Sequence, residues 1–515
     1  MQESASTAMI GSRTRRVYVI SDLHLGGAWP SEQTRGFRMM TRPEDLARFI
    51  RVLAARPSGP SDPEIELVIN GDFIDFLAEE HPRPRWLPFI RDPEVAVRVF
   101  EHVASQHGDR HVFDALAELL ARGHLLTLLL GNHDLELSFP AVRRAFERRI
   151  GAGPRSGLRF LYDGEAYEVG DALIEHGNRY DPANTVDHGQ LQQVRALQSR
   201  KRQDRESWSF EPPIGSRLVA ELMNPIKTEY QFIDLLKPES EPLFALLLAL
   251  EPRYRETIAQ MAKLLRIGIS GVKQKQSTRR GRFPLMFAST GDEDDAADQG
   301  ASGNDDEDLA AVLGRAMPEG EARAMVEELA REDGDGAGEA ATGAGGGGPV
   351  SFGITDAIVS RIGVAGLLVA GQVASVQQRL RLVQQALRAV DQDRSFDSGH
   401  EASRRYLTAA QDLGRRYRIV VFGHTHQAKE IELGGGAKYL NTGTWANLMR
   451  FPQTLFEDDS SRVMSALESF FENIRGNQLA AYIEFRPTYA RLEVTADGQT
   501  TGSLHTFDPE RGDVP

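Results

Sequence analysis

Short apolar runs alternate with longer amphipathic stretches along the first 190 residues. Four runs have the length and apolar character of buried strands: Val17–Ser21, Glu66–Asn70, Leu125–Leu130 and Ala172–Glu175. Between them, apolar residues recur at helical spacing in three stretches: Glu44–Ala55, Val95–Val103 and Val112–Ala121. Alternation of this kind predicts a layered α/β arrangement.

From about residue 190 the pattern becomes helical. The sequence predicts helices at Gln190–Arg205, Leu218–Ile233, Pro242–Leu265 and Ile362–Val390. The last has an apolar seam, which we interpret as a helix packed on its own domain, with a homodimer interface or a membrane-surface contact as alternatives. Between these helices, residues 291–348 are acidic and then glycine-rich, a composition that predicts disorder.

A β pattern returns after Tyr417. We expect consecutive antiparallel strands at Arg418–Phe422, Lys429–Leu433, Ala437–Leu440, Ala480–Phe485, Ala490–Val494 and Thr501–Thr506. Residues 1–189 and 411–515 are therefore predicted to form one domain. Residues 190–410 are predicted to be a helical insertion, because loops of that length are rare inside compact domains.

Composition narrows the class of protein. The 515-residue chain has no cysteine, which excludes disulfides, a thiol nucleophile and thiolate metal sites. A formal charge of −14 argues against a stable nucleic-acid partner. No apolar run reaches the length of about 20 residues that spans a bilayer. The first 16 residues are polar, so we expect no signal peptide and a cytoplasmic location.

Five apolar runs end abruptly in polar side chains that bind metals. The segments are Asp22-Leu23-His24, Gly71-Asp72-Phe73-Ile74-Asp75, Gly131-Asn132-His133-Asp134, His176-Gly177-Asn178 and Gly423-His424-Thr425-His426. Open sheets bind ligands beyond the carboxyl ends of their strands. If the backbone stays extended, residues two positions apart also face the same side. The glycines would let the chain turn and bring backbone close to a bound phosphate.

The donor set indicates a particular class of metal site. Imidazole and carboxylate ligands without thiolate suit Mn, Fe, Zn, Ni or Co. More ligands converge than one ion can use, so the sequence predicts a centre of two divalent ions. Such a centre lowers the pKa of a bound water and thereby supplies a hydroxide nucleophile near neutral pH.

The order D-x-H, G-D-x-x-D, G-N-H-[DE], lone H and G-H-x-H resembles the calcineurin-like metallophosphoesterase superfamily. The resemblance covers roughly residues 16–188 and 417–506. It implies an α/β fold in which two mixed β-sheets form a sandwich flanked by helices. The large α-helical insertion lies outside the resemblance, and we expect it to form a cap. The resemblance also implies hydrolysis of a phosphomonoester, phosphodiester or pyrophosphate bond by a bridging hydroxide, with Mn²⁺ as the favoured metal.

The resemblance also assigns roles to individual residues. One metal would be held by Asp22, His24, Asp72 and His426. The second would be held by Asp72, Asn132, His176 and His424, so that Asp72 bridges the two. His133 would contact the phosphate and protonate the leaving group, Asp134 would orient His133, and Asp75 would support the site from behind.

Some alternatives remain open. The opening Ser21–Leu25 is similar to the UDP-2,3-diacylglucosamine pyrophosphatase branch, which usually has Arg in place of His133 and is much shorter. A non-catalytic scaffold of the same fold is a rival from another class. The basic stretches Arg200–Arg202 and Arg279–Arg282 are interpreted as solvated surface. The alternative is a cap that recognises further phosphates, a nucleotide or anionic lipid headgroups.

Several residues near the ligand motifs have more than one interpretation. His188 is an alternative to His176 as a ligand, and we interpret it instead as a surface residue. Arg179 and Asp181 are interpreted as part of a salt-bridged loop, with contact to the substrate as the alternative. Asn441–Trp445 is expected either to line the site or to close the sheet with a turn.

Overall fold

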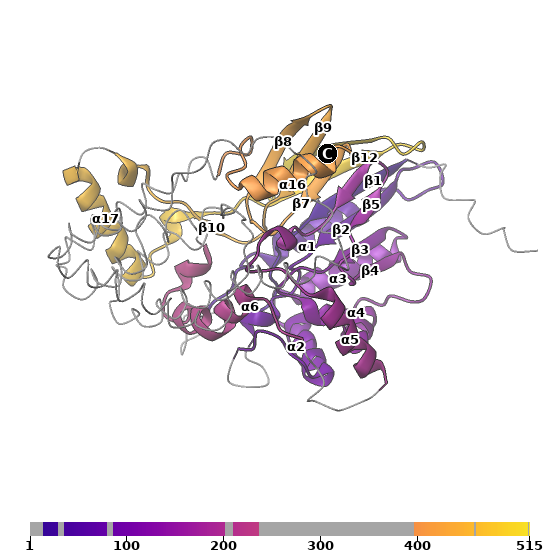
Figure 1. Cartoon of the computed structure of the whole chain (residues 1–515), viewed down its shortest axis with the longest axis horizontal. Coiled ribbons are helices and arrows are strands. Elements are labelled where there is room, and N and C mark those ends of the chain that lie inside the picture. The colour runs from indigo at the N-terminus through magenta and orange to yellow at the C-terminus, as the bar shows by residue number, and fades with distance from the viewer. Residues whose placement is uncertain are drawn as a thin grey trace, which may run out of the picture.

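The computed structural model describes residues 14–28, 36–79, 86–200, 210–235, 396–457, 460–512 and 514. Figure 1 shows two sheets packed together, with helices on their outer sides. Strands from the first and last parts of the chain lie side by side in both sheets. Among the described residues, no helix has the length and apolar character needed to cross a bilayer.

The larger sheet has six strands in the order β13-β12-β1-β2-β3-β4. They are β1 (Arg15–Ile20), β2 (Glu64–Asn70), β3 (Leu125–Leu129), β4 (Leu158–Leu161), β12 (Thr488–Val494) and β13 (Thr500–Thr506). Strands β1 to β4 are parallel, whereas β12 runs antiparallel to both β1 and β13. The carboxyl ends of β1, β2 and β3 therefore lie at one edge of the sheet.

The smaller sheet has five strands in the order β5-β6-β7-β9-β8. They are β5 (Tyr167–Val169), β6 (Ala172–Ile174), β7 (Ile419–Phe422), β8 (Ala428–Gly434) and β9 (Ala437–Thr442). Strand β7 lies parallel to β6 on one side and to β9 on the other, while β5 and β8 are antiparallel edge strands. Both sheets are therefore mixed. A separate two-stranded ribbon pairs β10 (Leu448–Met449) with β11 (Ile483–Glu484).

The alternation of side chains along β1 shows how the sheets pack. Val17 and Val19 point into a core shared with the smaller sheet, where they join residues such as Ile174 and Val421. Tyr18 and Ile20 point to the opposite face and pack against helices. Because successive strand residues face opposite sides, a strand buried on both faces is apolar throughout.

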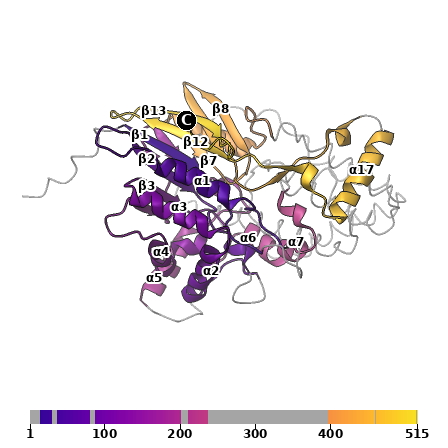
Figure 2. The ribbon, with the colours of Figure 1, turned by 180° about the vertical axis from the view of Figure 1, so that it is seen from behind.

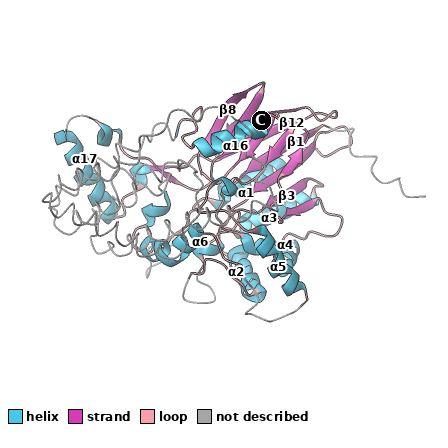
Figure 3. Cartoon of the chain, in the orientation of Figure 1, coloured by secondary structure: helices cyan, strands magenta, loops and turns pink. Residues whose placement is uncertain are grey.

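Helices cover the outer faces of both sheets (Figures 1 and 3). The larger sheet packs against α1 (Pro43–Ala54), α2 (Pro93–Ser105), α3 (Arg110–Ala121), α4 (Pro140–Arg149) and α5 (His188–Ser199). Three of these helices begin with proline, which lacks the N–H that a first helical position leaves unpaired. The smaller sheet packs against α16 (Arg404–Gly414). The resulting order helix, sheet, sheet, helix confirms the predicted sandwich.

The remaining described helices lie to one side of the sandwich. Figures 1 and 2 show α17 (Ser460–Arg475) beyond the sheets, next to the β10–β11 ribbon. The predicted helix Leu218–Ile233 forms in part: α6 (Ile214–Leu218) continues through a π-helical turn (Val219–Met223) into α7 (Asn224–Lys227), and a 3-10 helix follows at Gln231–Leu235. The helices predicted at Pro242–Leu265 and Ile362–Val390, and the predicted disorder at 291–348, lie outside the described residues.

The predicted arrangement of the C-terminal strands was wrong in two respects. The strands are not consecutive antiparallel neighbours, because β7 pairs in parallel and β12 crosses to the other sheet to pair with β1. The predicted strand Ala480–Phe485 is a 3-10 turn followed by the two-residue strand β11. Local patterning reports strand propensity, whereas the partner is chosen by packing.

Glu136 is a buried carboxyl in the core beside the site, and it gives a prediction about pH. Its Oε1 accepts a hydrogen bond from the Ile90 N–H at 2.6 Å. Burial raises the pKa of Glu136 from 4.5 to about 8. The folded state therefore holds a proton that the unfolded chain releases above about pH 4.5, and stability falls as pH rises towards 8.

We expect Glu136→Gln to be more stable than the wild type at pH 8, by about 1.4 kcal/mol for each pH unit between the two pKa values. The difference should shrink as pH falls and vanish below pH 4.5, where the carboxyl is protonated in both states. Urea unfolding of both proteins at pH 5, 6.5 and 8 measures this. A difference that stays constant with pH would contradict it.

Candidate metal centre

The expected ligands follow five parallel strands of the two sheets. Asp22 and His24 follow β1, Asp72 follows β2 and Asn132 follows β3, all in the larger sheet. His176 follows β6, and His424 and His426 follow β7, in the smaller sheet. The two sheets therefore present their ligand loops at the same edge of the sandwich, and the structure brings six of the seven expected ligands together in two groups. The seventh, Asn132, precedes His133, whose N–H donates to Asp72.

These loops have a strained backbone. Among the described residues, six other than glycine have positive φ, and five of them are the expected ligands Asp22, His24, Asp72, His424 and His426. The expectation that extended backbone directs both pairs, Asp22 with His24 and His424 with His426, into the site was therefore wrong. Left-handed backbone after the strand directs them there. Left-handed conformations cost energy in residues with a Cβ and concentrate at functional sites.

The first ligand group comprises Asp22, His24 and His426, whose donor atoms lie within 4.8 Å of one another. The Nε2 atoms of His24 and His426 are 3.2 Å apart, and His426 Nε2 is 3.3 Å from Asp22 Oδ1. Asp22 and His24 are 0% and 1% exposed. Buried imidazole and carboxylate groups at these separations are typical of a metal site.

The second ligand group comprises Asp72, His176 and His424. Asp72 Oδ2 lies 3.3 Å from His176 Nε2 in this group and 3.8 Å from His24 Nε2 in the first. One carboxylate oxygen thus lies between the two groups. The other oxygen, Oδ1, accepts the His133 N–H at 2.9 Å, which fixes the orientation of the carboxylate.

The lone pairs at the second group fit a metal ion. His176 Nδ1 donates to the Asn70 carbonyl at 2.8 Å, so in the neutral ring, the form that binds a metal, Nε2 carries the lone pair. This Nε2 and Asn132 Oδ1 are both buried and accept no hydrogen bond from the described residues. Buried acceptors are normally satisfied, so two unsatisfied acceptors beside a carboxylate match the donor set of a divalent cation.

Charges within the cluster act on one another strongly. Burial alone would raise the pKa of Asp72, but His176 and His133 hold it well below its usual range. Burial opposes protonation of His176, but the charges of Asp72 and Asp22 outweigh it and raise the pKa of His176 to about 10. The carboxylates therefore stabilise positive charge at this position, whether it is carried by protons or by a cation.

Glycines make room for ligands in these loops. A Cβ at Gly71 would lie 2.5 Å from His176 Nδ1, and one at Gly423 would lie 2.7 Å from Asp22 Oδ2. A Cβ at Gly131 would collide with the Asp72 carboxylate. We expected all four glycines to permit turns. Of these, only Gly71 and Gly177 have a positive φ, whereas Gly131 and Gly423 provide space for a carboxylate.

The carboxylate that contacts His133 is not the expected one. His133 Nδ1 lies 3.0 Å from Asp75 Oδ1, and Asp75 Oδ2 lies 3.3 Å from His24 Nδ1. Burial opposes protonation of His133, but the charges of Asp75 and Asp72 prevail and raise its pKa. Asp75 therefore orients both a ligand and the expected general acid.

Asp134 has a different position from the one we expected. Its Oδ1 accepts the Gly131 N–H at 2.7 Å and its Oδ2 accepts the Phe73 N–H at 2.8 Å. The side chain thus joins the loops that follow β2 and β3, instead of orienting His133. Burial and the charge of Asp72 raise its pKa. The expectation that Asp134 orients His133 was therefore wrong, because both oxygens of Asp134 accept backbone N–H groups.

The loop after β6 contains ionic contacts, as expected, and one of them reaches a ligand, a contact that the sequence did not indicate. Arg179 pairs with Glu175 at 3.1 Å, whereas Asp181 Oδ2 accepts a hydrogen bond from His424 Nε2 at 3.1 Å. This contact leaves His424 Nδ1 with the lone pair, as in the carboxylate–histidine–metal arrangements of metalloproteins. One feature of the sequence could have indicated this contact: Asp181 lies in the same loop as the expected ligand His176. His188 is half-buried at the start of α5 and belongs to none of the ligand groups.

We expect Asp181→Asn to weaken metal binding about 10- to 100-fold, because the His424 ring loses the carboxylate that orients it. Titration of metal-depleted protein with Mn²⁺ or Zn²⁺ against a chelating indicator measures the affinity. Asp163→Asn, in a neighbouring loop where Asp163 pairs with Arg195, is the matched control. Equal affinities in all three proteins would show that the contact is incidental.

Residues 210–235 cover one side of the site. The Ser216 hydroxyl contacts the Asn132 carbonyl at 3.5 Å, and Asn224 Nδ2 donates to the Leu77 carbonyl at 2.7 Å. Lys227 is 4% exposed, and its charge lowers the pKa of His133. A cation so near His133 was not anticipated from the sequence, because one lysine in a helical pattern carries no signal of its own.

The loop after β9 supports the ligands from the C-terminal side. The Thr444 hydroxyl donates to the Asp22 carbonyl at 2.7 Å, and Asn441 Nδ2 donates to the Gly423 carbonyl at 2.9 Å. Of the two interpretations of Asn441–Trp445, these contacts favour a segment that lines the site. Trp445 itself is fully buried in the core.

Comparison with known proteins gives one assignment. The family model of calcineurin-like phosphoesterases matches residues 15–231, a range that includes the ligand loops after β1, β2, β3 and β6. No curated protein matches the chain significantly. The ligand loops at the sheet edge and the family match agree, and the chain therefore contains a metallophosphoesterase domain of the calcineurin-like phosphoesterase family.

Proposed function

We propose that the chain hydrolyses a phosphomonoester, phosphodiester or pyrophosphate bond at a centre of two divalent metal ions. The position of Asp72 carries this proposal, since one oxygen lies within 3.8 Å of a histidine nitrogen from each ligand group. A carboxylate placed in this way can bridge two ions, which is the arrangement that two-metal hydrolases use.

The ligands divide between the two ions as follows. One ion would be held by Asp22, His24, Asp72 and His426, and the other by Asp72, Asn132, His176 and His424. When bound, the ions supply an activated water and neutralise charge on the phosphate. Mn²⁺ is our preferred metal, because carboxylate, amide and imidazole donors without sulfur suit it.

Protein side chains would protonate the leaving group. As the oxygen of water bonds to phosphorus, the bond from phosphorus to the leaving oxygen breaks, and that oxygen must gain a proton. His133 is placed to donate it: Asp75 fixes Nδ1 and favours the charged ring. Lys227, whose charge reaches His133, adds positive potential where the phosphate oxygens would lie.

The test uses metal-depleted protein that is reconstituted separately with Mn²⁺, Zn²⁺, Fe²⁺ or Mg²⁺. Hydrolysis of p-nitrophenyl phosphate and bis(p-nitrophenyl) phosphate is then measured. We expect hydrolysis that depends on added metal, and one ¹⁸O atom in the phosphate product in H₂¹⁸O. A protein that binds the metals but hydrolyses neither substrate, nor a pyrophosphate diester, would favour the scaffold role over the enzyme.

A further inference from the structure

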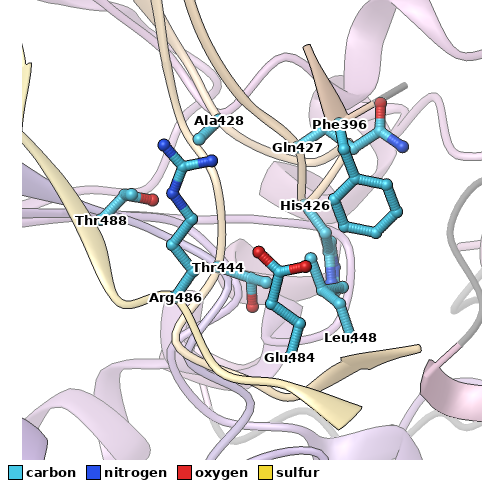
Figure 4. Close-up of a pocket in the computed structure, with 9 residues that line it drawn as sticks. All are labelled: Phe396, His426, Gln427, Ala428, Thr444, Leu448, Glu484, Arg486 and Thr488. Atoms are coloured by element: carbon cyan, nitrogen blue, oxygen red, sulfur yellow. The ribbon is translucent and has the colours of Figure 1, made fainter. Parts of the chain in front are cut away.

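A pocket opens beside the first ligand group, formed by the C-terminal part of the chain (Figure 4). Its lining includes His426, Thr444, Leu448, Phe396, Glu484 and Arg486. Because His426 belongs to the first ligand group, the pocket adjoins the metal centre. The Thr444 hydroxyl holds the Asp22 carbonyl at 2.7 Å and so ties this wall to the ligand loop after β1. A group bound in the pocket would be next to the reacting phosphate.

The pocket has one apolar and one charged side. Leu448, which is 8% exposed, and Phe396 supply apolar surface. Leu448 pairs with Glu484 across the β10–β11 ribbon, so an apolar and a charged side chain are held next to each other at the pocket. Figure 4 shows the Arg486 side chain rising along the wall opposite Phe396, towards Ala428.

The charges in the pocket do not cancel. Glu484 pairs with Arg450 at 3.6 Å, and the Arg450 guanidinium also lies 5.4 Å from the Phe396 ring centroid. Arg486, in contrast, has no ion pair or hydrogen bond with any of the described residues. The pocket therefore carries one positive charge that no described carboxylate neutralises. An arginine in this state is suited to bind a carboxylate or phosphate with two parallel hydrogen bonds.

We propose that this pocket binds the organic part of the substrate, and that Arg486 recognises a second anionic group on it. The substrate class is then a phosphate ester or anhydride that carries an apolar or aromatic portion and another anion, either a carboxylate or a further phosphate. This inference rests on the proposed function. It adds a specificity-determining residue outside the ligand loops and beyond residue 231, where the family match ends.

The test compares substrates that differ only in the second group. The probes are 4-carbamoylphenyl phosphate, which is neutral at that position, 4-carboxyphenyl phosphate and 4-phosphonophenyl phosphate. Their kcat/KM values are measured in the wild type, in Arg486→Gln and in Arg486→Glu. Arg415→Gln is the matched control, because Arg415 is an exposed arginine directly after α16 that pairs with Asp412.

In the wild type we expect the carboxylated or phosphonylated probe to exceed the neutral one about 10- to 100-fold, the effect of a charge-assisted hydrogen bond. The two anionic probes distinguish the kind of anion. Arg486→Gln should remove the preference, Arg486→Glu should reverse it, and Arg415→Gln should keep it. A preference that is the same in the wild type and Arg486→Gln would overturn the assignment of Arg486.

A binding measurement separates this inference from the proposed function. Calorimetry with 4-carboxybenzylphosphonate and 4-carbamoylbenzylphosphonate, which cannot be hydrolysed, should show the same 10- to 100-fold preference in the wild type and its loss in Arg486→Gln. If no probe is hydrolysed yet this preference is present, the proposed function fails and the anion site stands. If the probes are hydrolysed without any preference, the anion site fails and the phosphoesterase activity stands.

Discussion

Replacement of Asp72 with asparagine should reduce metal-dependent phosphate hydrolysis at least about 1,000-fold, the largest effect that we predict for a single residue. The carboxylate lies between both ligand groups, so its loss weakens the coordination of both ions. Activated water and charge neutralisation are together worth several kcal/mol, and each 1.4 kcal/mol is a factor of about ten in rate. Steady-state kinetics with p-nitrophenyl phosphate and Mn²⁺ measures the change.

The asparagine variant is chosen because it keeps the local structure. Asparagine retains an oxygen that can accept the His133 N–H now held by Asp72 Oδ1. Asp114→Asn is the control, since Asp114 is a partly exposed aspartate that pairs with Arg149. Equal thermal unfolding of the two variants would show that the loss of activity is not a loss of fold. Wild-type activity in Asp72→Asn would rule out a bridging role.

His133→Gln should give the second largest effect, a decrease in kcat of about 100- to 10,000-fold for substrates with poor leaving groups. The effect should be small for p-nitrophenyl phosphate, whose leaving group needs no proton. The reason is the position of His133, with Nδ1 held by Asp75 and a raised pKa that favours the donating form. Rates across a series of aryl phosphates measure the dependence on leaving-group pKa.

The slope of that series is the informative quantity. The wild type should show a shallow dependence on leaving-group pKa, and His133→Gln a steep one. Asp75→Asn should lie between them, because it leaves the imidazole in place but removes its partner. His107→Gln, at an exposed histidine between α2 and α3, should match the wild type. Parallel slopes for the wild type and His133→Gln would remove His133 from the proton transfer.

The sequence predicted the ligand set because each ligand follows directly after an apolar run. The end of β1 is marked by the change from Val17–Ile20 to Asp22, and β7 ends in the same way before His424. Such changes are local, so one sequence suffices to find them. The two mixed sheets followed from the resemblance, since local patterning favoured an antiparallel C-terminal part.

Contacts between distant residues could not be predicted in this way. Asp75 and Asp134 are both close to His133 along the chain, and only the folded loops decide that Asp75 contacts the ring while Asp134 accepts backbone N–H groups. Asp181 meets His424 across 243 positions. Left-handed backbone at ligand residues is likewise imposed by the surrounding structure, because a residue with a Cβ does not prefer it.

Secondary structure was missed where the apolar signal was weak. Helix α4 has the sequence PAVRRAFERR, in which Val142, Ala145 and Phe146 are the buried residues, too few to mark a helical face. The predicted helix Leu218–Ile233 contains Pro225, which has no N–H to donate. The turn before Pro225 is π-helical, and α7 ends two residues after it, at Lys227. The extent of the insertion and the cytoplasmic location stay predictions.

Metal content tests the central claim most directly. Protein stripped with a chelator, reconstituted with Mn²⁺ and passed through a desalting column is analysed by inductively coupled plasma mass spectrometry, beside Asp72→Asn and Asp114→Asn. We predict close to two ions per chain for the wild type and Asp114→Asn, and fewer than one for Asp72→Asn. A wild-type protein that retains one ion or none with each of Mn²⁺, Zn²⁺ and Fe²⁺ would contradict a centre of two metals.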